Sequence, residues 1–232
     1  MRRRALAEFI GTALLLIAVV GSGIAAQRLS PSDRGLELLE NALATGAALT
    51  AIIFVVGAVS GAHLNPVVSV VDATVGGLLW RQLPAYLSAQ VAGACAGAFV
   101  ANLMFSLPAL QVSQRQRSGG GMWLSEVVAT LGLLLVIFAL ARTGRAHVAP
   151  VAVGAYIAGA YFFTSSTSFA NPAVTVARMF SDTFAGIAPS SAPAFVAFQL
   201  AGAGLALLVI RGLYPDYTDV ERRVVVPQES AP

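Results

Sequence analysis

The sequence predicts an all-α membrane protein in which six transmembrane helices and two re-entrant half-helices form an inverted repeat. Of its 232 residues 57% are apolar and 11% are charged, whereas soluble domains carry about 25% charged residues. Six apolar runs are long enough to approach or cross about 30 Å of hydrocarbon. An Asn-Pro pair follows the second run and recurs after the fifth.

The six apolar runs justify six membrane spans. They cover 5–26, 41–59, 84–107, 122–141, 148–164 and 192–210. The first is too long, and too poor in a small-residue cleavage site, for a signal peptide, so it counts as a span. Between the spans we expect a polar outer loop over 27–41 and a mobile outer connection over 111–121.

Two of the spans open with a glutamate in similar surroundings. Glu8 lies in Ala-Glu-Phe-Ile-Gly-Thr, and Glu126 lies in Ser-Glu-Val-Val-Ala-Thr. A carboxylate in hydrocarbon is costly unless it faces protein or water. The alternative is that both lie at the level of the lipid headgroups.

The two Asn-Pro elements predict short helices that begin inside the membrane. Asparagine is a good N-cap, and proline is tolerated at the first helical position because its missing N–H would have been unpaired there. Residues 67–79 are too few to cross the membrane, so the chain must dip in and return. A single Asn-Pro would indicate an ordinary turn, but two copies after two spans favour helix starts. The motif residues are Asn65, Pro66, Val67, Asn171, Pro172 and Ala173.

Three landmarks recur in the same order and indicate an internal repeat. Glu, Asn-Pro and Gln occur at positions 8, 65 and 90, and again at 126, 171 and 199. Each half holds three spans, so the halves enter the membrane from opposite sides. We expect a single membrane domain with repeats over about 4–107 and 121–211, followed by a polar cytoplasmic tail over 212–232.

The arginines predict the orientation in the membrane. All fourteen basic residues are arginine, and an excess of basic residues marks the cytoplasmic side. With both termini cytoplasmic in the inner cell membrane, nine arginines lie inside and five lie outside. The inner set is Arg2, Arg3, Arg4, Arg81, Arg142, Arg145, Arg211, Arg222 and Arg223, and the outer set is Arg28, Arg34, Arg115, Arg117 and Arg178. Because these charges are spread over loops, nucleic acid is not an expected partner.

The arrangement predicts passage of neutral solutes. Two helix N-termini that meet at the midplane present positive dipole ends and amide donors, which suit hydroxyl groups and repel cations. We find no catalytic constellation or metal-ligand cluster, so no enzyme, metal or cofactor is expected. A secondary transporter would normally need an intramembrane carboxylate for ion coupling, and we expect none apart from Glu8 and Glu126, which lie near the starts of spans. The single Cys95 lies inside the third span and excludes an intrachain disulfide.

The chain resembles the aquaporin or major intrinsic protein family over about residues 4–212. The resemblance rests on Ala-Glu-Phe-Ile-Gly-Thr, Ser-Gly-Ala-His-Leu-Asn-Pro-Val, Ala-Gln-Val-Ala-Gly-Ala and the second Asn-Pro-Ala. It implies one pore per protomer in a homotetramer, embedded among membrane lipids. It also implies that Asn65 and Asn171 orient solute, and that Glu8 and Glu126 brace the re-entrant loops. His63 matches a family histidine below the first half-helix, with plain packing as its alternative.

The departures from the family pattern concern selectivity. Val174 stands where the family usually has an arginine, as in a bacterial branch whose second motif reads Asn-Pro-Ala-Val and which is associated with arsenic species. The resemblance implies filter side chains that are small and uncharged, and therefore a wide opening. The alternative is that the bulky side chain of Phe54, Tyr156 or Phe163 fills this space. The implied filter consists of Thr45, Gly159, Ser168 and Val174.

One arginine lies near this filter. Arg178 is four residues after Val174, and we expect it to snorkel to the outer surface rather than to replace the missing charge. We therefore expect a broad passive channel for arsenous acid, glycerol-like polyols and water. A water-selective aquaporin is the first alternative, and a secondary transporter of a small neutral solute is the second.

Overall fold

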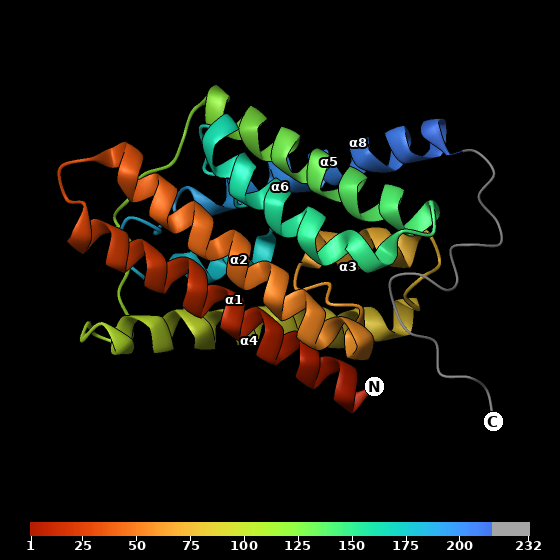
Figure 1. Ribbon diagram of the computed structural model, residues 1–232, viewed down its shortest axis with the longest axis horizontal. Coiled ribbons are helices and arrows are strands. Elements are labelled where there is room, and N and C mark those ends of the chain that lie inside the picture. The colour runs from red at the N-terminus through yellow and green to blue at the C-terminus, as the bar shows by residue number, and fades with distance from the viewer. Residues whose placement is uncertain (215–232) are drawn as a thin grey trace.

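The computed structural model describes residues 1–214, and within them the chain forms eight α-helices and two short 3-10 turns (Figure 1). Six elements are long and apolar enough to cross a membrane, and two helices are short. The long ones are α1 (Arg2–Leu29), α2 (Arg34–Ser60), α4 (Leu83–Met104) with η1 (Trp80–Gln82), α5 (Gly120–Arg142), α6 (Ala149–Phe163) with η2 (Ala146–Val148), and α8 (Ala192–Leu213). The short ones are α3 (Pro66–Thr74) and α7 (Pro172–Arg178). The predicted fold class is confirmed, and the chain is an integral membrane protein.

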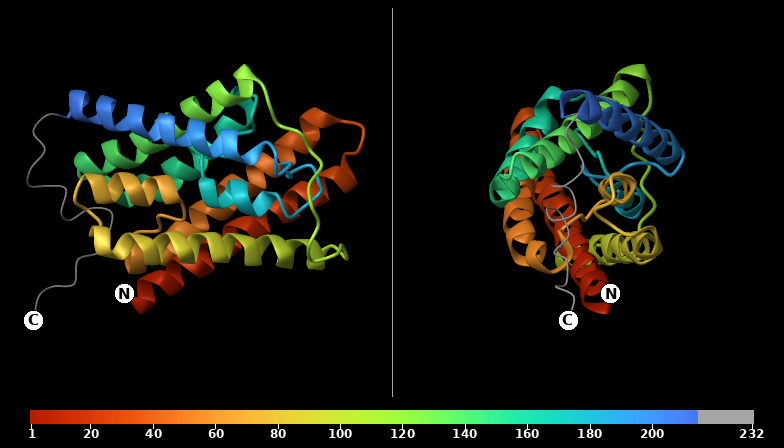
Figure 2. Two further views of the ribbon diagram at one scale, coloured as in Figure 1. Left: turned by 180° about the vertical axis from the view of Figure 1, so that it is seen from behind. Right: turned by 90° about the vertical axis from the view of Figure 1, so that its right-hand side faces the viewer.

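The contacts between helices repeat from one half of the chain to the other. Helix α1 packs on α2 and α4, and α5 packs correspondingly on α6 and α8. Each short helix also contacts a long helix of the other half, since α3 touches α8 and α7 touches α4. In Figure 2 α3 and α7 lie end to end along the bundle. The half-helices therefore approach from opposite ends and meet inside.

Glycines at matched positions bring the long helices of each half together. A Cβ atom on Gly93 of α4 would lie 2.2 Å from the Phe9 carbonyl oxygen of α1. A Cβ atom on Gly202 of α8 would lie 2.6 Å from the Val127 carbonyl oxygen of α5. Only small residues permit such close backbone approach between membrane helices. Each glycine stands three residues after the repeated glutamine, so close packing places that glutamine beside the glutamate of the neighbouring helix.

The outer loop predicted over 27–41 is much shorter than expected. Helix α1 continues to Leu29, and α2 already begins at Arg34. The carboxylate of Asp33 accepts hydrogen bonds from the backbone N–H groups of Gly35 and Leu36, at 2.9 and 3.0 Å. The polar residues that suggested a loop are thus an N-cap and the first turn of a helix.

The outer connection between α4 and α5 was predicted to be mobile, and that prediction is wrong for its central part. The Ser113 N–H donates to the Met179 carbonyl at 2.9 Å, and the Ala188 N–H donates to the Arg115 carbonyl at 2.8 Å. The Arg117 side chain is buried and donates to the carbonyls of Gly186, Ser166 and Phe184. These bonds join the connection to the segment that follows α7 and, through Ser166, to the segment that precedes it.

The two described ends of the chain lie at one end of the bundle, where α1 begins and α8 finishes (Figure 1). Of the cytoplasmic tail predicted over 212–232, the structure describes residues 212–214, and α8 includes the first two of these. Its remainder lies outside the described residues.

Candidate functional site

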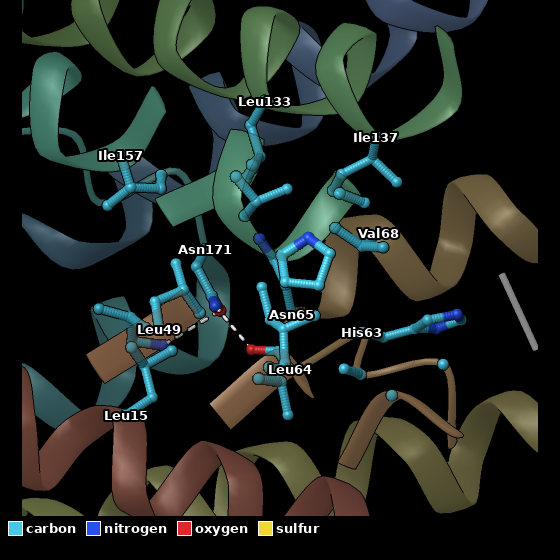
Figure 3. A pocket seen from close by; sticks show the side chains of 18 of the residues that line it. Leu15, Leu49, His63, Leu64, Asn65, Val68, Leu133, Ile137, Ile157 and Asn171 are labelled. Carbon is cyan, nitrogen blue, oxygen red and sulfur yellow. Dashed lines mark hydrogen bonds between the residues drawn. The ribbon is translucent and has the colours of Figure 1, made fainter. Parts of the chain in front are cut away.

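The two Asn-Pro motifs meet head to head within the bundle (Figure 3). The Asn65 side-chain oxygen caps α3 by accepting the Val67 N–H at 3.0 Å, and the Asn171 oxygen caps α7 by accepting the Ala173 N–H at 2.9 Å. Each proline occupies the first turn, where its missing N–H costs nothing. Both short helices therefore begin at the middle of the molecule.

The side-chain amides of Asn65 and Asn171 also join the two motifs. Asn65 donates to the carbonyl of Ala170, and Asn171 donates to the carbonyl of Leu64, both at 2.8 Å. An amide group carries two N–H donors, and each bond uses one of them. No second acceptor for either amide occurs within residues 1–214, and both asparagines line the central cavity. One donor from each is therefore available to a solute.

The backbone that leads into each motif is held in an uncommon conformation. Ala62 and Leu64 have φ values of 49° and 51°, and Ser168 and Ala170 have 49° and 47°. These residues stand three and one positions before the two asparagines. Left-handed geometry costs a residue with a side chain on the order of 1–3 kcal/mol and persists only where neighbouring groups enforce it.

Buried carboxylates enforce this geometry in both halves. Glu8 accepts the backbone N–H groups of His63 and Leu64 at 3.0 and 2.7 Å. Glu126 accepts those of Phe169 and Ala170 at 3.0 and 2.9 Å. Both carboxylates are 0% exposed, so the alternative position at the lipid headgroups is wrong.

The repeated glutamines complete each carboxylate site. The Gln90 side-chain amide donates to Glu8 at 2.7 Å and to the Ser69 hydroxyl at 2.9 Å. Gln199 donates to Glu126 at 2.6 Å and to the Thr175 hydroxyl at 2.9 Å. Sequence reasoning identified the glutamines only as landmarks and missed the two hydroxyls. The signal was present, because Ser69 and Thr175 both stand four residues after the motif asparagine.

His63 contacts a buried carboxylate that the sequence interpretation did not consider. Its Nε2 lies 3.4 Å from Asp72 Oδ2, its Nδ1 lies 3.0 Å from the Ser69 hydroxyl, and its ring packs on Tyr86. Asp72 belongs to α3 and is 2% exposed. The prediction that Glu8 and Glu126 are the only intramembrane carboxylates is therefore wrong. Asp72 is nevertheless engaged by His63, which lines the cavity.

A continuous cavity of about 420 Å³ passes the two motifs. Aliphatic side chains form much of its wall, and Asn65 and Asn171 bring polar groups to it at the two motifs (Figure 3). The aliphatic lining includes Leu15, Leu49, Leu133, Ile137, Val153 and Ile157. The polar lining includes Thr45, His63, Asn65, Tyr161, Ser168 and Asn171.

Three of the four predicted filter residues line this cavity. They are Thr45, Ser168 and Val174. The Thr45 hydroxyl lies 3.3 Å from the hydroxyl of Tyr161 on the neighbouring α6. The Ser168 hydroxyl is buried and has no hydrogen-bond partner in the described part of the chain.

Gly159 does not line the cavity, so the prediction that it belongs to the filter is wrong. It is exposed, whereas Val153, Ile157 and Tyr161 of the same helix face the cavity. Successive residues of a helix are separated by about 100°, which puts Gly159 on the other side of α6. Tyr161 takes its place, so the α6 side of the filter is bulky. Phe54, suggested as a bulky substitute, does line the cavity, whereas Tyr156 and Phe163 do not.

Arg178 is buried, so its predicted snorkelling to the surface is wrong. It is 1% exposed and lines the cavity. Its Nε donates to the Ala185 carbonyl, and its guanidinium carbon lies 3.5 Å from the centre of the Phe169 ring.

The guanidinium carbon of Arg117 lies 5.0 Å from the centre of the same Phe169 ring. Burial, followed by the nearby charges of Arg178 and Arg115, holds the pKa of Arg117 well below its usual range.

Residues 1–170 match the family model described as "Major intrinsic protein". The chain belongs to the major intrinsic protein family. It is 51% identical over 213 residues to "Aquaglyceroporin AqpS" of Rhizobium meliloti (strain 1021), covering 92% of this chain and 91% of that relative. Over 181 residues it is 36% identical to the "Glycerol uptake facilitator protein" of Pseudomonas aeruginosa, covering 66% of this chain and 63% of that relative.

A solved structure shares the fold. It is the aquaglyceroporin from Plasmodium falciparum, with a TM-score of 0.67 at 23% identity, and the match covers 91% of this chain and 98% of that one. At this identity the likeness shows the fold alone.

Proposed function

We propose that this protein is a passive membrane channel for small neutral solutes such as glycerol. The observation that carries the proposal is the pair of amide donors that Asn65 and Asn171 leave free beside one continuous cavity. Such donors can replace part of the hydration of a hydroxyl group without binding it tightly. The resemblance to proteins named as an aquaglyceroporin and a glycerol uptake facilitator supports the same conclusion.

The two kinds of cavity wall suit a polyol. Glycerol has hydroxyl groups along one side of a short carbon chain and C–H groups along the other. Aliphatic side chains such as Leu49, Leu133 and Ile157 can contact the C–H groups, while Asn65 and Asn171 donate to the hydroxyls. A solute that bound tightly would stay in the pore. Weak hydrogen bonds on the hydroxyl side of glycerol therefore favour its rapid passage.

The proposed solute range includes arsenous acid and water. Thr45, Ser168 and Val174 contribute small side chains to the outer part of the cavity, and Val174 leaves open the space that an arginine would fill. Arsenous acid is a neutral trihydroxide at physiological pH, so it presents hydroxyls of the kind glycerol does. Tyr161 lines the cavity from α6 and occupies part of the space at the filter.

Proteoliposomes that contain the purified protein provide the test. Stopped-flow light scattering measures water and glycerol uptake, and arsenous acid uptake is measured by elemental analysis of filtered vesicles. We expect glycerol and arsenous acid permeability well above that of protein-free vesicles. Water permeability without glycerol permeability would instead support the water-selective alternative.

We also propose that the protein forms a homotetramer in the inner cell membrane with its termini in the cytoplasm. The arginine distribution supports the orientation, and the resemblance supports the tetramer. The resemblance also implies one pore in each protomer. Light scattering of the detergent-solubilised protein tests its mass, and labelling of a cysteine placed at Arg34 from outside intact cells tests the orientation.

A further inference from the structure

Two buried arginines lie near the outer end of α7, and they differ in what their guanidinium groups do. Arg117 directs Nε, Nη1 and Nη2 to three backbone carbonyls. Arg178 uses only Nε, which donates to the Ala185 carbonyl. Its Nη groups have no hydrogen-bond acceptor among residues 1–214. Arg117 therefore stabilises the surrounding loops, whereas Arg178 retains N–H donors that no described protein group accepts.

Arg178 is also without a carboxylate partner. Arg178 takes part in neither the ion pair of Arg34 with Glu37 nor that of His63 with Asp72. The guanidinium instead stacks on the Phe169 ring. Stacking on an aromatic ring holds an arginine in place but leaves its positive charge uncancelled. This charge borders the cavity, since Arg178 is one of the lining residues.

The position of Arg178 on α7 relates it to the filter. Val174 and Arg178 both line the cavity, and residues four apart lie on the same face of a helix. At a rise of 1.5 Å per residue Arg178 lies about 6 Å farther out than Val174. Solutes are therefore selected by size at Thr45, Tyr161 and Val174, and by charge farther out, at Arg178.

We propose that Arg178 is a specificity-determining residue of the outer pore, which repels cations and donates hydrogen bonds to solute oxygen atoms. The proposal rests on the proposed channel function and assigns the charge selection of the channel to this residue. The uncharged filter at Val174 therefore does not make the pore permeable to cations. Neutral solutes rich in acceptor oxygens are drawn to the outer mouth, where they exchange water for the Nη donors.

The test measures the ratio of sodium leak to glycerol flux in proteoliposomes. Arg178→Gln removes the charge and keeps a polar side chain, and we expect the ratio to rise about tenfold. Arg34→Gln is the charge-matched control, because the Arg34 side chain is 75% exposed, and it should leave the ratio unchanged. The double variant Arg178→Gln, Val174→Arg should restore cation exclusion by returning a charge to the pore.

A lysine variant distinguishes the effect of the positive charge of Arg178 from the effect of its hydrogen-bond donors. It also provides a test if Arg178→Gln does not assemble. Arg178→Lys keeps the charge but loses the planar donors, so we expect cation exclusion to persist while glycerol flux falls severalfold. An assembled Arg178→Gln protein with the wild-type ratio would overturn the proposal. If that variant does not assemble, wild-type glycerol flux in Arg178→Lys overturns the donor role. Absence of glycerol flux in the wild-type protein would instead refute the channel function itself.

Discussion

Asn65 and Asn171 are joined crosswise, because each side-chain amide donates at 2.8 Å to the carbonyl of the residue that precedes the other asparagine. Each asparagine also caps its own half-helix. One side chain thus orients the start of both half-helices. The contact between the two repeats and the donors offered to solute depend on the same pair of residues.

Replacing either asparagine with alanine should reduce stability and glycerol flux together. Loss of the cap costs about 1 kcal/mol, and loss of the crosswise bond adds to this. Asn65→Asp keeps the capping oxygen but removes the donors, so it should retain more stability than Asn65→Ala and still conduct poorly. Thermal unfolding in detergent and stopped-flow glycerol uptake distinguish the two effects. A double alanine variant that assembles and conducts normally would refute both roles.

Glu8→Gln and Glu126→Gln should each weaken the fold markedly. The new amide N–H group would face backbone donors that the carboxylate now accepts, which leaves buried groups unpaired at a cost of about 1–3 kcal/mol. Glu40→Gln is a suitable control, since its carboxylate accepts one hydroxyl, that of Ser30. The yield of assembled protein and its melting temperature report the effect. Equal melting temperatures for the Glu8 and Glu40 variants would contradict the bracing role.

Val174→Arg should convert the pore into a narrower one. The new side chain would enter the outer constriction opposite Thr45 and Tyr161, so flux of glycerol and arsenous acid should fall more than flux of water. A second guanidinium near Arg178 also adds repulsion, and burial without a partner is costly, so assembly must be checked in the same preparation. If the assembled variant passes all three solutes in the wild-type ratio, Val174 does not line the filter.

Mercurial reagents should inhibit the wild-type channel poorly. Cys95 is the single cysteine of the chain, and it is partly buried against the core and absent from the cavity lining. The filter position at 168 carries serine. Glycerol flux measured before and after mercuric chloride gives the answer. Inhibition that disappears in Cys95→Ser would show that the thiol reaches the pore.

Transport should remain passive although Asp72 adds a buried carboxylate. Asp72 pairs with His63 inside the protein, and the substitution Asp72→Asn removes the charge while it keeps the size of the side chain. Both the wild-type protein and this variant should let glycerol equilibrate across vesicles with or without a proton gradient. Accumulation driven by that gradient in the wild type, and its loss in Asp72→Asn, would favour a secondary transporter.

Local features of the sequence were sufficient for most of the architecture. The lengths of the apolar runs set the spans, the Asn-Pro pairs set the starts of α3 and α7, and the order of Glu, Asn and Gln revealed the repeat. Each of these signals comes from a few adjacent residues. A cap needs only the next turn, and a span needs only enough apolar residues.

Tertiary packing alone decided which side chains reach the pore. Helix α6 is apolar on all sides, so its sequence carries no period that marks the inner face. Its rotation is set by close contact with α2, where a Cβ on Gly154 would lie 2.6 Å from the Gly46 carbonyl oxygen. That contact turns Tyr161 inward and Gly159 outward. Arg178 was likewise placed by the Phe169 ring and the Ala185 carbonyl, partners that helical spacing from Val174 does not reveal.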